Sequence, residues 1–456
     1  MQNNHSIKRK LGSLSLLAGL ISFSITGFAQ QEVPATLAGH SILPVNSTVS
    51  SPENAPSDMQ VSGKFTTGVR VDSLGKVEGK SADRPTGMHI PIKGQPRQGH
   101  SGIKRMADGT YWVLTDNGFG NKANSPDSML YVTQYNIDFQ SGNTTPLKTV
   151  FFHDPDKIIP FHITNESTKQ RYLTGSDFDP ESFQFAGGAL WVGDEFGPYL
   201  IKMDLDGKVL ALFETQVDGK KVVSPDHYQI TTPGKPADKV NFQVNRSKGF
   251  EGMASSPDGS KLYPMLEGAI WLDDKQDYEH VDGKRAARIL EFDVKKQNWT
   301  GRSWLYVFED NQNAIGDFNL IDDTHGLIIE RDNGEGTADK ACTAGSSNTE
   351  NCFSNLAKFK RVYRIEFSDN NIGKPVDKQA YIDLMNIKDP NNMARKPLNN
   401  GVFTFPFFTI ENVDVVDSEH IIVGNDNNYP FSSSREPNKA DDNEFILLNV
   451  PELLKP

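Results

Sequence analysis

One short stretch places several carboxylates close together. Residues 182–192 predict a β-hairpin that turns at a Gly-Gly pair, with Glu181 before it and Asp194 and Glu195 after it. In an antiparallel hairpin the two open ends lie about 5 Å apart. Because like charges repel at that distance, a cation or a set of hydrogen-bond donors must offset them. The hairpin therefore indicates an ion site or a dense hydrogen-bond network.

The same layout recurs along the chain and predicts the architecture. Each copy is a polar or acidic start, an apolar strand, a turn, a second apolar strand and an acidic finish, and the further copies cover residues 101–117, 251–267, 317–330 and 411–426. Repeated hairpins with additional outer strands are typical of β-propeller blades. The copies lie further apart than the ~40 residues of a bare blade, so long inter-blade loops are expected. We predict an all-β, six-bladed β-propeller, with five or seven blades or two stacked β-sandwiches as alternatives.

A propeller would bring the hairpin carboxylates to one central opening, because the innermost strand of each blade lines the channel. Glutamates and aspartates at the hairpin ends would ring its mouth, Glu267 and Asp332 among them. An all-oxygen set suits Ca²⁺ first and Mg²⁺ or Mn²⁺ next, whereas zinc-type spacings of His and Cys are absent from the sequence. The predicted cation ligands are Glu181, Glu251, Asp317, Glu411, Asp116 and Asp426. The alternative is that these acids bind backbone amides and tie blades together.

A cation at the channel mouth would support ester hydrolysis. It polarises a phosphoryl or carbonyl oxygen and acidifies water, and a spare carboxylate then acts as general base. The predicted catalytic carboxylates are Glu181, Asp194, Glu195 and Glu330. The predicted contacts to an anionic substrate are Arg246, Lys248, Arg331 and Lys104, with salt bridges as the alternative role. A nucleophile-elbow motif is absent from the sequence, which disfavours serine-hydrolase chemistry.

The net charge and the N-terminal segment limit the possible partners and the cellular location of the protein. A net charge of −12 argues against nucleic acid or an anionic membrane as a partner. Residues 1–29 have the basic start, apolar run and small-residue end of a signal peptide, so we expect a periplasmic or secreted protein without stable membrane insertion after cleavage. Residues 30–58 are predicted as a polar linker and 59–456 as the propeller. We expect a monomer.

Cys342 and Cys352 are the only cysteines, and both lie in a polar loop. In an oxidising compartment they are expected to form a disulfide that pins the loop. A metal pair is the alternative, disfavoured because a third Cys or a His is absent nearby.

Distinctive residues mark four of the hairpins: Gly102-Ile103 with 114–120, Asp179-Pro180-Glu181-Ser182 with 193–199, Gly249-Phe250-Glu251-Gly252-Met253, and Glu330-Arg331-Asp332. Over roughly residues 60–450 the sequence resembles the bacterial phytase-like proteins, also called the "esterase-like activity of phytase" family. The resemblance implies an exported β-propeller and a phosphoester or ester hydrolase. It implies no role for any individual residue.

These observations predict an exported, metal-dependent hydrolase of small anionic phosphoesters. Two alternatives remain: a calcium-dependent lactonase or carboxylesterase on the same fold, and a non-catalytic propeller whose long loops hold a protein or glycan.

Overall fold

The computed structural model describes residues 30–230 and 241–455, so the predicted signal segment lies outside the described residues. The described chain is nearly all β. Its α-helix is α1 (Pro451–Leu454), and its short 3-10 turns are η1 (Ser57–Gln60), η2 (Ala338–Lys340) and η3 (Asp369–Asn371). None of these described helices is long and apolar enough to cross a membrane.

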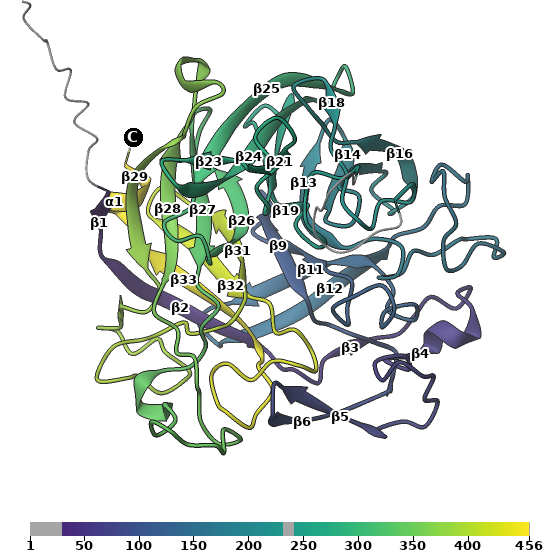
Figure 1. Ribbon diagram of the computed structural model, residues 1–456. Helices are drawn as coiled ribbons and strands as arrows, with labels where there is room; N and C mark the ends of the chain where they lie inside the picture. Colours follow the sequence, from purple (N-terminus) through teal and green to yellow (C-terminus); the bar gives the residue numbers. More distant parts are fainter. Residues whose placement is uncertain (1–29, 231–240, 456) are drawn as a thin grey trace, which may run out of the picture.

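Five antiparallel four-stranded arrays form the body of the molecule (Figure 1). Each array is called a sheet below, although one parallel pairing, between Asn143 and Ile42, joins the first array to the fifth. The first contains β9 (His100–Arg105), β10 (Tyr111–Thr115), β11 (Tyr131–Asp138) and β12 (Asn143–Phe151), and the second β13 (Pro180–Ala186), β14 (Ala189–Asp194), β15 (Tyr199–Met203) and β16 (Val209–Glu214). The third contains β19 (Phe250–Ser255), β20 (Lys261–Leu266), β24 (Lys284–Asp293) and β25 (Asn298–Val307). The fourth contains β26 (Ala314–Leu320), β27 (His325–Arg331), β28 (Lys360–Glu366) and β29 (Asp377–Asp383), and the fifth β31 (Ile410–Val415), β32 (His420–Asn425), β33 (Asn443–Asn449) and β2 (Ala35–Leu43).

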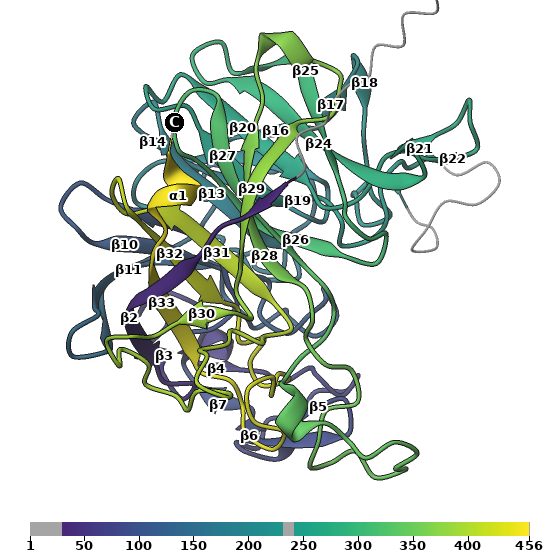
Figure 2. The same cartoon turned by 90° about the vertical axis from the view of Figure 1, so that its left-hand side faces the viewer.

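Short strands decorate this body. They pair as β3 (Thr48–Val49) with β8 (Gln95–Pro96), β4 (Val61–Ser62) with β7 (Ile92–Lys93), β5 (Val77–Ser81) with β6 (Arg84–Ile90), β17 (Gln216–Val217) with β18 (Lys220–Lys221), and β21 (Trp271–Leu272) with β22 (Asp277–Tyr278). Three more add to the sheets: β1 (Gln31–Glu32) on β29, β23 (His280–Val281) on β24 and β30 (Ile387–Lys388) on β2. Strands β3 to β8, which lie between β2 and β9 in the chain, form a small lobe of short paired strands at one end of the molecule (Figure 2).

The five sheets close a ring in a propeller-like arrangement. Their inner strands contact one another in the cyclic order β9, β13, β19, β26, β31 and back to β9, and their labels gather at the centre of Figure 1. A separate apolar core fills each junction between neighbouring sheets, as Ile103 and Phe445 do between the first and fifth. The structure therefore corrects the prediction of six blades. The described residues supply five sheets, and the fifth is already in contact with the first.

The structure also corrects the prediction of a polar linker over residues 30–58. Within residues 30–58, β2 pairs antiparallel with β33 and forms the outer strand of the fifth sheet (Figure 2). Its apolar residues alternate into the core, where Ala35 and Leu37 are at most 2% exposed. Polar residues around β2 concealed this pattern in the sequence. The chain thus closes its ring by joining an N-terminal strand to the C-terminal hairpin.

An amide network ties the inner strands together along the axis. The Gln184 Nε2 atom in β13 donates to the Met253 carbonyl of β19 (2.7 Å) and to Asn319 Oδ1 of β26 (2.8 Å). Asn319 Nδ2 in turn donates to the carbonyls of Val413 in β31 (2.8 Å) and Ile103 in β9 (3.4 Å). Two side chains therefore connect all five sheets, and they fill the middle of the channel with hydrogen-bonded polar groups.

Leu37→Ala tests whether β2 is part of the core. Leu37 is fully buried, so the substitution should lower the free energy of unfolding by about 2–5 kcal/mol in chemical denaturation. The matched control is Leu147→Ala in β12, where the side chain is 54% exposed and the change should stay within about 0.5 kcal/mol. Equally small losses for both variants would make β2 a dispensable surface segment.

Candidate functional site

Each inner strand carries a β-bulge near its first residues. In the second sheet, Pro180 pairs with Asp194 and Ser182 with Gly193, so Glu181 has no partner opposite it. The same irregularity recurs at Glu251 in β19, at Glu411 in β31, at Ser101-Gly102 in β9 and at Gly316-Asp317 in β26. A bulge leaves one residue outside the ladder and re-aims its side chain. The fold therefore presents one re-aimed residue per sheet.

Register equivalence defines two rings of side chains at the axis. The bulge ring contains Ser101, Glu181, Glu251, Gly316 and Glu411. In each sheet, the residue just before the bulge pairs with a residue on the second strand, and the next residue along that second strand belongs to the second ring. These residues are Asp116, Glu195, Glu267, Arg331 and Asp426. Four sheets supply an acid to the second ring. The fourth sheet differs: it has Gly316, which lacks a side chain, in the bulge ring and Arg331 in the second ring.

The acids of these rings meet in space. Three overlapping groups each place one oxygen per residue within 4.8 Å of the others: Asp179, Glu181 and Glu195; Glu181, Glu251 and Glu411; and Glu195, Glu251 and Glu267. We call these residues, together with Asp116 and Asp426, the carboxylate cluster. Its members are buried apart from the half-buried Glu181 and Asp116. The cluster therefore meets solvent mainly where those two side chains lie.

Burial and mutual repulsion raise the pKa of the cluster's carboxyls. Loss of solvent raises the pKa of Glu181, Glu195 and Glu251 well above the ordinary value, and neighbouring carboxylates raise it further. Burial, with the charge of Asp179, raises the pKa of Asp116 to about 8. Without a cation the cluster is therefore expected to hold protons at neutral pH.

Two basic side chains offset part of the charge. Arg331 Nη2 donates to Glu411 Oε1 at 3.3 Å, and Lys248 Nζ forms an ion pair with Glu267. Ser101 Oγ also donates to Glu411 Oε2 at 3.1 Å. These donors leave Glu195 Oε1 buried with no hydrogen-bond partner among the described residues.

The cluster fits a hard divalent cation. Its donors are all carboxylate oxygens, which Ca²⁺ accepts in sets of six to eight with flexible geometry. The unpartnered Glu195 oxygen points to a missing positive group. The predicted ligands Glu181, Glu251 and Glu411 belong to the three groups, and Asp116 and Asp426 lie beside them.

Three cluster members were not among the predicted ligands: Glu195 was predicted as a catalytic carboxylate, and Asp179 and Glu267 were predicted in neither role. Asp179 lies two residues before Glu181, and a residue at that spacing on a strand faces the same side. Glu267 follows its strand at the position that Glu195 and Asp426 occupy in theirs, and the sequence analysis placed it only at the mouth. Comparison of the hairpins residue by residue could have identified Glu267, whereas the residues equivalent to Asp179 in the other sheets are not acidic.

Three predicted acids lie outside the carboxylate cluster and have other partners. Glu330 precedes Arg331 and faces away from the axis, where Tyr306 Oη (2.7 Å) and Lys378 Nζ (2.9 Å) bind its carboxylate. Asp194 accepts the backbone N–H groups of residues 179 and 197, at 2.8 and 2.7 Å, and so shapes the turn beside the cluster. Asp317 accepts backbone N–H groups from residues 318 and 413, at 2.7 and 3.0 Å.

Of the four predicted substrate contacts, two lie at the cluster and two lie elsewhere. Lys248 and Arg331 lie at the cluster. Lys104 lies in the axial network, bonded to Asn319 (3.1 Å) and Asp414 (3.2 Å). Arg246 is half-exposed and forms an ion pair with Asp226. The predicted disulfide between Cys342 and Cys352 is confirmed.

Comparisons with known proteins identify the family. A family model described as phytase-like, with esterase-like activity of phytase, matches residues 95–429. An uncharacterized secreted protein of Arthroderma benhamiae is 31% identical over 115 residues, which are 24% of this chain and 22% of that protein. The match thus spans about a fifth of that relative's length.

Solved structures give only remote similarity. A luciferin-regenerating enzyme has 11% identity and a TM-score of 0.34, with 90% of this chain and 96% of that chain covered. The calcium-binding protein regucalcin of Agrobacterium tumefaciens has 13% identity and a TM-score of 0.33, with 77% and 91% covered. Similarity at this level carries no information on activity.

Calcium should stabilise the protein more at pH 8 than at pH 6. The folded pKa of Asp116, about 8, exceeds its ordinary 3.8, so its contribution to the free energy of unfolding is present at low pH and is lost as pH rises through 8. A cation replaces these protons, and its effect should grow over the same range. Thermal unfolding with chelator and with Ca²⁺ at both pH values measures the difference. A melting temperature that Ca²⁺ leaves unchanged at pH 8 would contradict a cation site.

Glu251→Gln should separate stability from cation binding. Glu251 belongs to two of the carboxylate groups, and removal of its charge relieves repulsion in the metal-free protein. The metal-free variant should unfold at or above the wild-type temperature at pH 8. Its Ca²⁺ affinity, measured by calorimetric titration, should fall by about tenfold or more. Glu452→Gln, on the exposed face of α1, is the matched control and should change neither quantity.

Proposed function

We infer that this chain, which belongs to the phytase-like family, is an exported hydrolase that cleaves phosphoesters with the help of a divalent cation at the carboxylate cluster. One observation carries the proposal: overlapping groups of carboxylates at the axis lie directly beside Arg331, the one basic residue of the second ring. Acids supply the ligands for a cation, and the arginine supplies a contact for a phosphate.

Glu181, Glu195 and Glu251 are the central ligands in this proposal, because each belongs to two of the carboxylate groups. Calcium is the favoured ion, with magnesium or manganese as substitutes. When bound, such an ion neutralises the cluster, polarises a phosphoryl oxygen and acidifies water.

Asp116 is the proposed general base. It belongs to the cluster but lies outside the three groups, and it is half-buried where the cluster meets solvent. Its Oδ1 accepts the Gly118 N–H at 2.7 Å, which fixes the carboxylate in place. Burial raises its pKa to about 8 in the metal-free protein, and the charge of a bound cation would lower that pKa so that the carboxylate is ionised and able to accept a proton near neutral pH. Asp194 and Glu330, the other predicted catalytic acids outside the groups, are bound to backbone or ion-pair partners.

Arg331 is the proposed phosphate contact. Gly316 in the bulge ring has no side chain, and Arg331 of the same sheet lies next to Glu411. The Arg331 guanidinium also contacts Asn333 Oδ1 at 3.1 Å and lies 5.5 Å from the ring centre of the partly exposed Phe408. These contacts hold the guanidinium in one orientation, which favours bidentate binding of a phosphate.

Export has two supports besides the N-terminal sequence. The disulfide between Cys342 and Cys352 is stable in an oxidising compartment, and the relative from Arthroderma benhamiae is named as secreted. We therefore propose a periplasmic or secreted monomer that acts on a small anionic ester, with neither nucleic acid nor a membrane as partner.

A carboxyl ester or lactone is the second candidate substrate. The family description names esterase-like activity, and a carboxyl ester needs the same cation and base but no arginine contact. The two candidates therefore differ in whether catalysis depends on Arg331.

Phosphomonoester hydrolysis should require Ca²⁺ and Arg331. Release of phosphate from a chromogenic phosphomonoester should disappear in chelator and return with Ca²⁺. Arg331→Lys should lower kcat/KM by about 100-fold, because a lysine cannot make the bidentate contact, while the Ca²⁺-dependent rise in melting temperature persists. Arg361→Lys in β28, whose guanidinium packs on Tyr381, is the matched control and should retain activity.

Other outcomes separate the alternatives. Turnover of lactones or acetyl esters without phosphate release, unchanged in Arg331→Lys, would replace the phosphoester with a carboxyl ester. A bound cation with no turnover of either substrate would identify a binding protein rather than an enzyme.

A further inference from the structure

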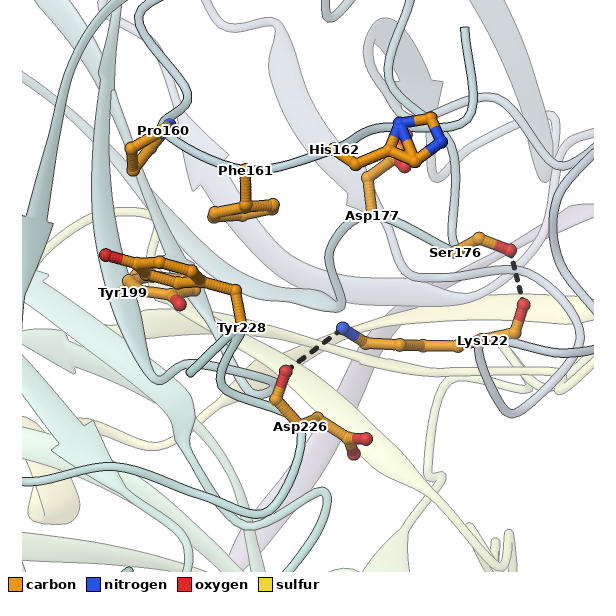
Figure 3. A pocket seen from close by; sticks show the side chains of 9 residues that line it. All are labelled: Lys122, Pro160, Phe161, His162, Ser176, Asp177, Tyr199, Asp226 and Tyr228. Atoms are coloured by element: carbon orange, nitrogen blue, oxygen red, sulfur yellow. Dashed lines mark hydrogen bonds between the residues drawn. The ribbon is translucent and has the colours of Figure 1, made fainter. Parts of the chain in front are cut away.

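A cavity of about 320 Å³ lies beside the carboxylate cluster, among the loops around the second sheet. Its walls include Lys122, Phe161, Asp177, Tyr199 and Tyr228, all drawn in Figure 3. The volume lies at the small end of ligand sites in proteins and suits one or two fused rings. None of these residues has a part in the hydrolytic machinery described above.

Stacked aromatic rings form one wall of the cavity. The Phe161 ring lies 5.2 Å from Tyr228 with an interplanar angle of 22°, and 5.8 Å from Tyr199 at 25° (Figure 3). Phe178 supports Phe161 from the core side at 5.6 Å. Tyr228 nevertheless remains 41% exposed. A rigid aromatic wall that stays open to solvent is suited to bind a flat ring.

A short segment separates this cavity from the carboxylate cluster. Asp177 lines the cavity, and its carboxylate accepts the N–H groups of Thr164 (2.7 Å) and Thr174 (2.8 Å). Two residues later, Asp179 belongs to the cluster. The cavity and the cluster therefore lie next to each other at the start of β13.

Lys122 connects the cavity with the cluster. Its Nζ donates to the Asp226 carbonyl at 3.2 Å (Figure 3). The same Nζ lies 4.7 Å from the Phe196 ring centre. Its positive charge also acts on the carboxylates of Asp179 and Asp194. An ammonium group between a cluster of acids and an aromatic wall can bind the oxygen that leaves when an ester is cleaved.

We propose that this cavity binds the alcohol part of the ester substrate and selects an aromatic ring there. The inference rests on the proposed function, because it assumes that the ester bond is cleaved at the cluster. Water adds to phosphorus, the bond from phosphorus to the ring oxygen breaks, and the released phenolate takes up the proton that water loses. Phe161 and Tyr228 would bind the ring, and Lys122 would donate a hydrogen bond to its oxygen.

The test compares two phosphomonoesters and one substitution. Tyr228→Ala should raise KM for 1-naphthyl phosphate by about tenfold, because the ring loses its stacking partner, and should leave KM for glycerol 2-phosphate unchanged. Tyr381→Ala, a half-buried tyrosine on β29 of the fourth sheet, is the matched control and should change neither value. Because Tyr228 is partly exposed, the variant should fold, which its melting temperature verifies.

A binding measurement separates this proposal from the proposed function. Quenching or shift of 1-naphthol fluorescence reports occupancy of the cavity without any turnover. Wild type and Tyr381→Ala should bind naphthol equally, and Tyr228→Ala about tenfold more weakly. If naphthol binds in this pattern but neither ester is cleaved, the cavity assignment stands and the phosphoester hydrolase fails. If Tyr228→Ala binds naphthol as wild type does, the cavity assignment is overturned whatever the turnover.

Discussion

Repulsion among buried carboxylates is the constraint around which this molecule is built. Acids from four sheets converge at the axis, and burial raises the pKa of Asp179, Glu181, Glu195, Glu251 and Glu411. Such an arrangement opposes folding unless other interactions hold the strands in place. The five apolar cores between neighbouring sheets provide that support. The acids can therefore remain close together because the scaffold that carries them is rigid.

The fourth sheet breaks the symmetry of the rings, and this gives the site a direction. Arg331 and Gly316 occupy positions at which most other sheets have acids, so one side of the cluster is less negative than the rest. The loop after Arg331 is fixed by Lys360, whose buried Nζ contacts Asp332 Oδ1 at 3.0 Å and the Gly334 carbonyl at 2.9 Å. An anionic group that approaches the cluster would meet repulsion on four sides and attraction on one. Substrate orientation would then follow from a single sheet.

The sequence predicted the hairpins and the central acids because both depend on local pattern. Alternating apolar residues and acidic strand ends identified β13 and β14, and the convergence of Glu181 with Glu251 followed from ring closure. The sequence could not predict which of two neighbouring residues faces the axis, because this depends on strand register. A difference of one residue decides that Arg331 faces the axis and Glu330 the interior of its sheet, and a bulge in β26 changes that parity without any sequence signal.

Ring closure is the other feature that local pattern does not reveal. β2 pairs with β33 across almost the whole chain, so its role depends on a partner that no nearby residue indicates. The number of blades was overestimated for the same reason. A chain that closes its last sheet with an N-terminal strand needs no additional blade between its two ends.

Two layers of side chains lie at the axis: an amide network that holds the inner strands together and the carboxylate cluster that could bind a cation. Below the charged cluster, Gln184 and Asn319 connect the five inner strands through hydrogen bonds of amide side chains, which themselves neither gain nor lose protons. Above them, the acids are free to exchange protons for a cation, because the strands that carry them are already held from below. Had the cluster itself been the only link between the inner strands, loss of the cation would open the ring. With the amide layer in place, a cation bound at the cluster would be able to leave and return while the fold stays intact.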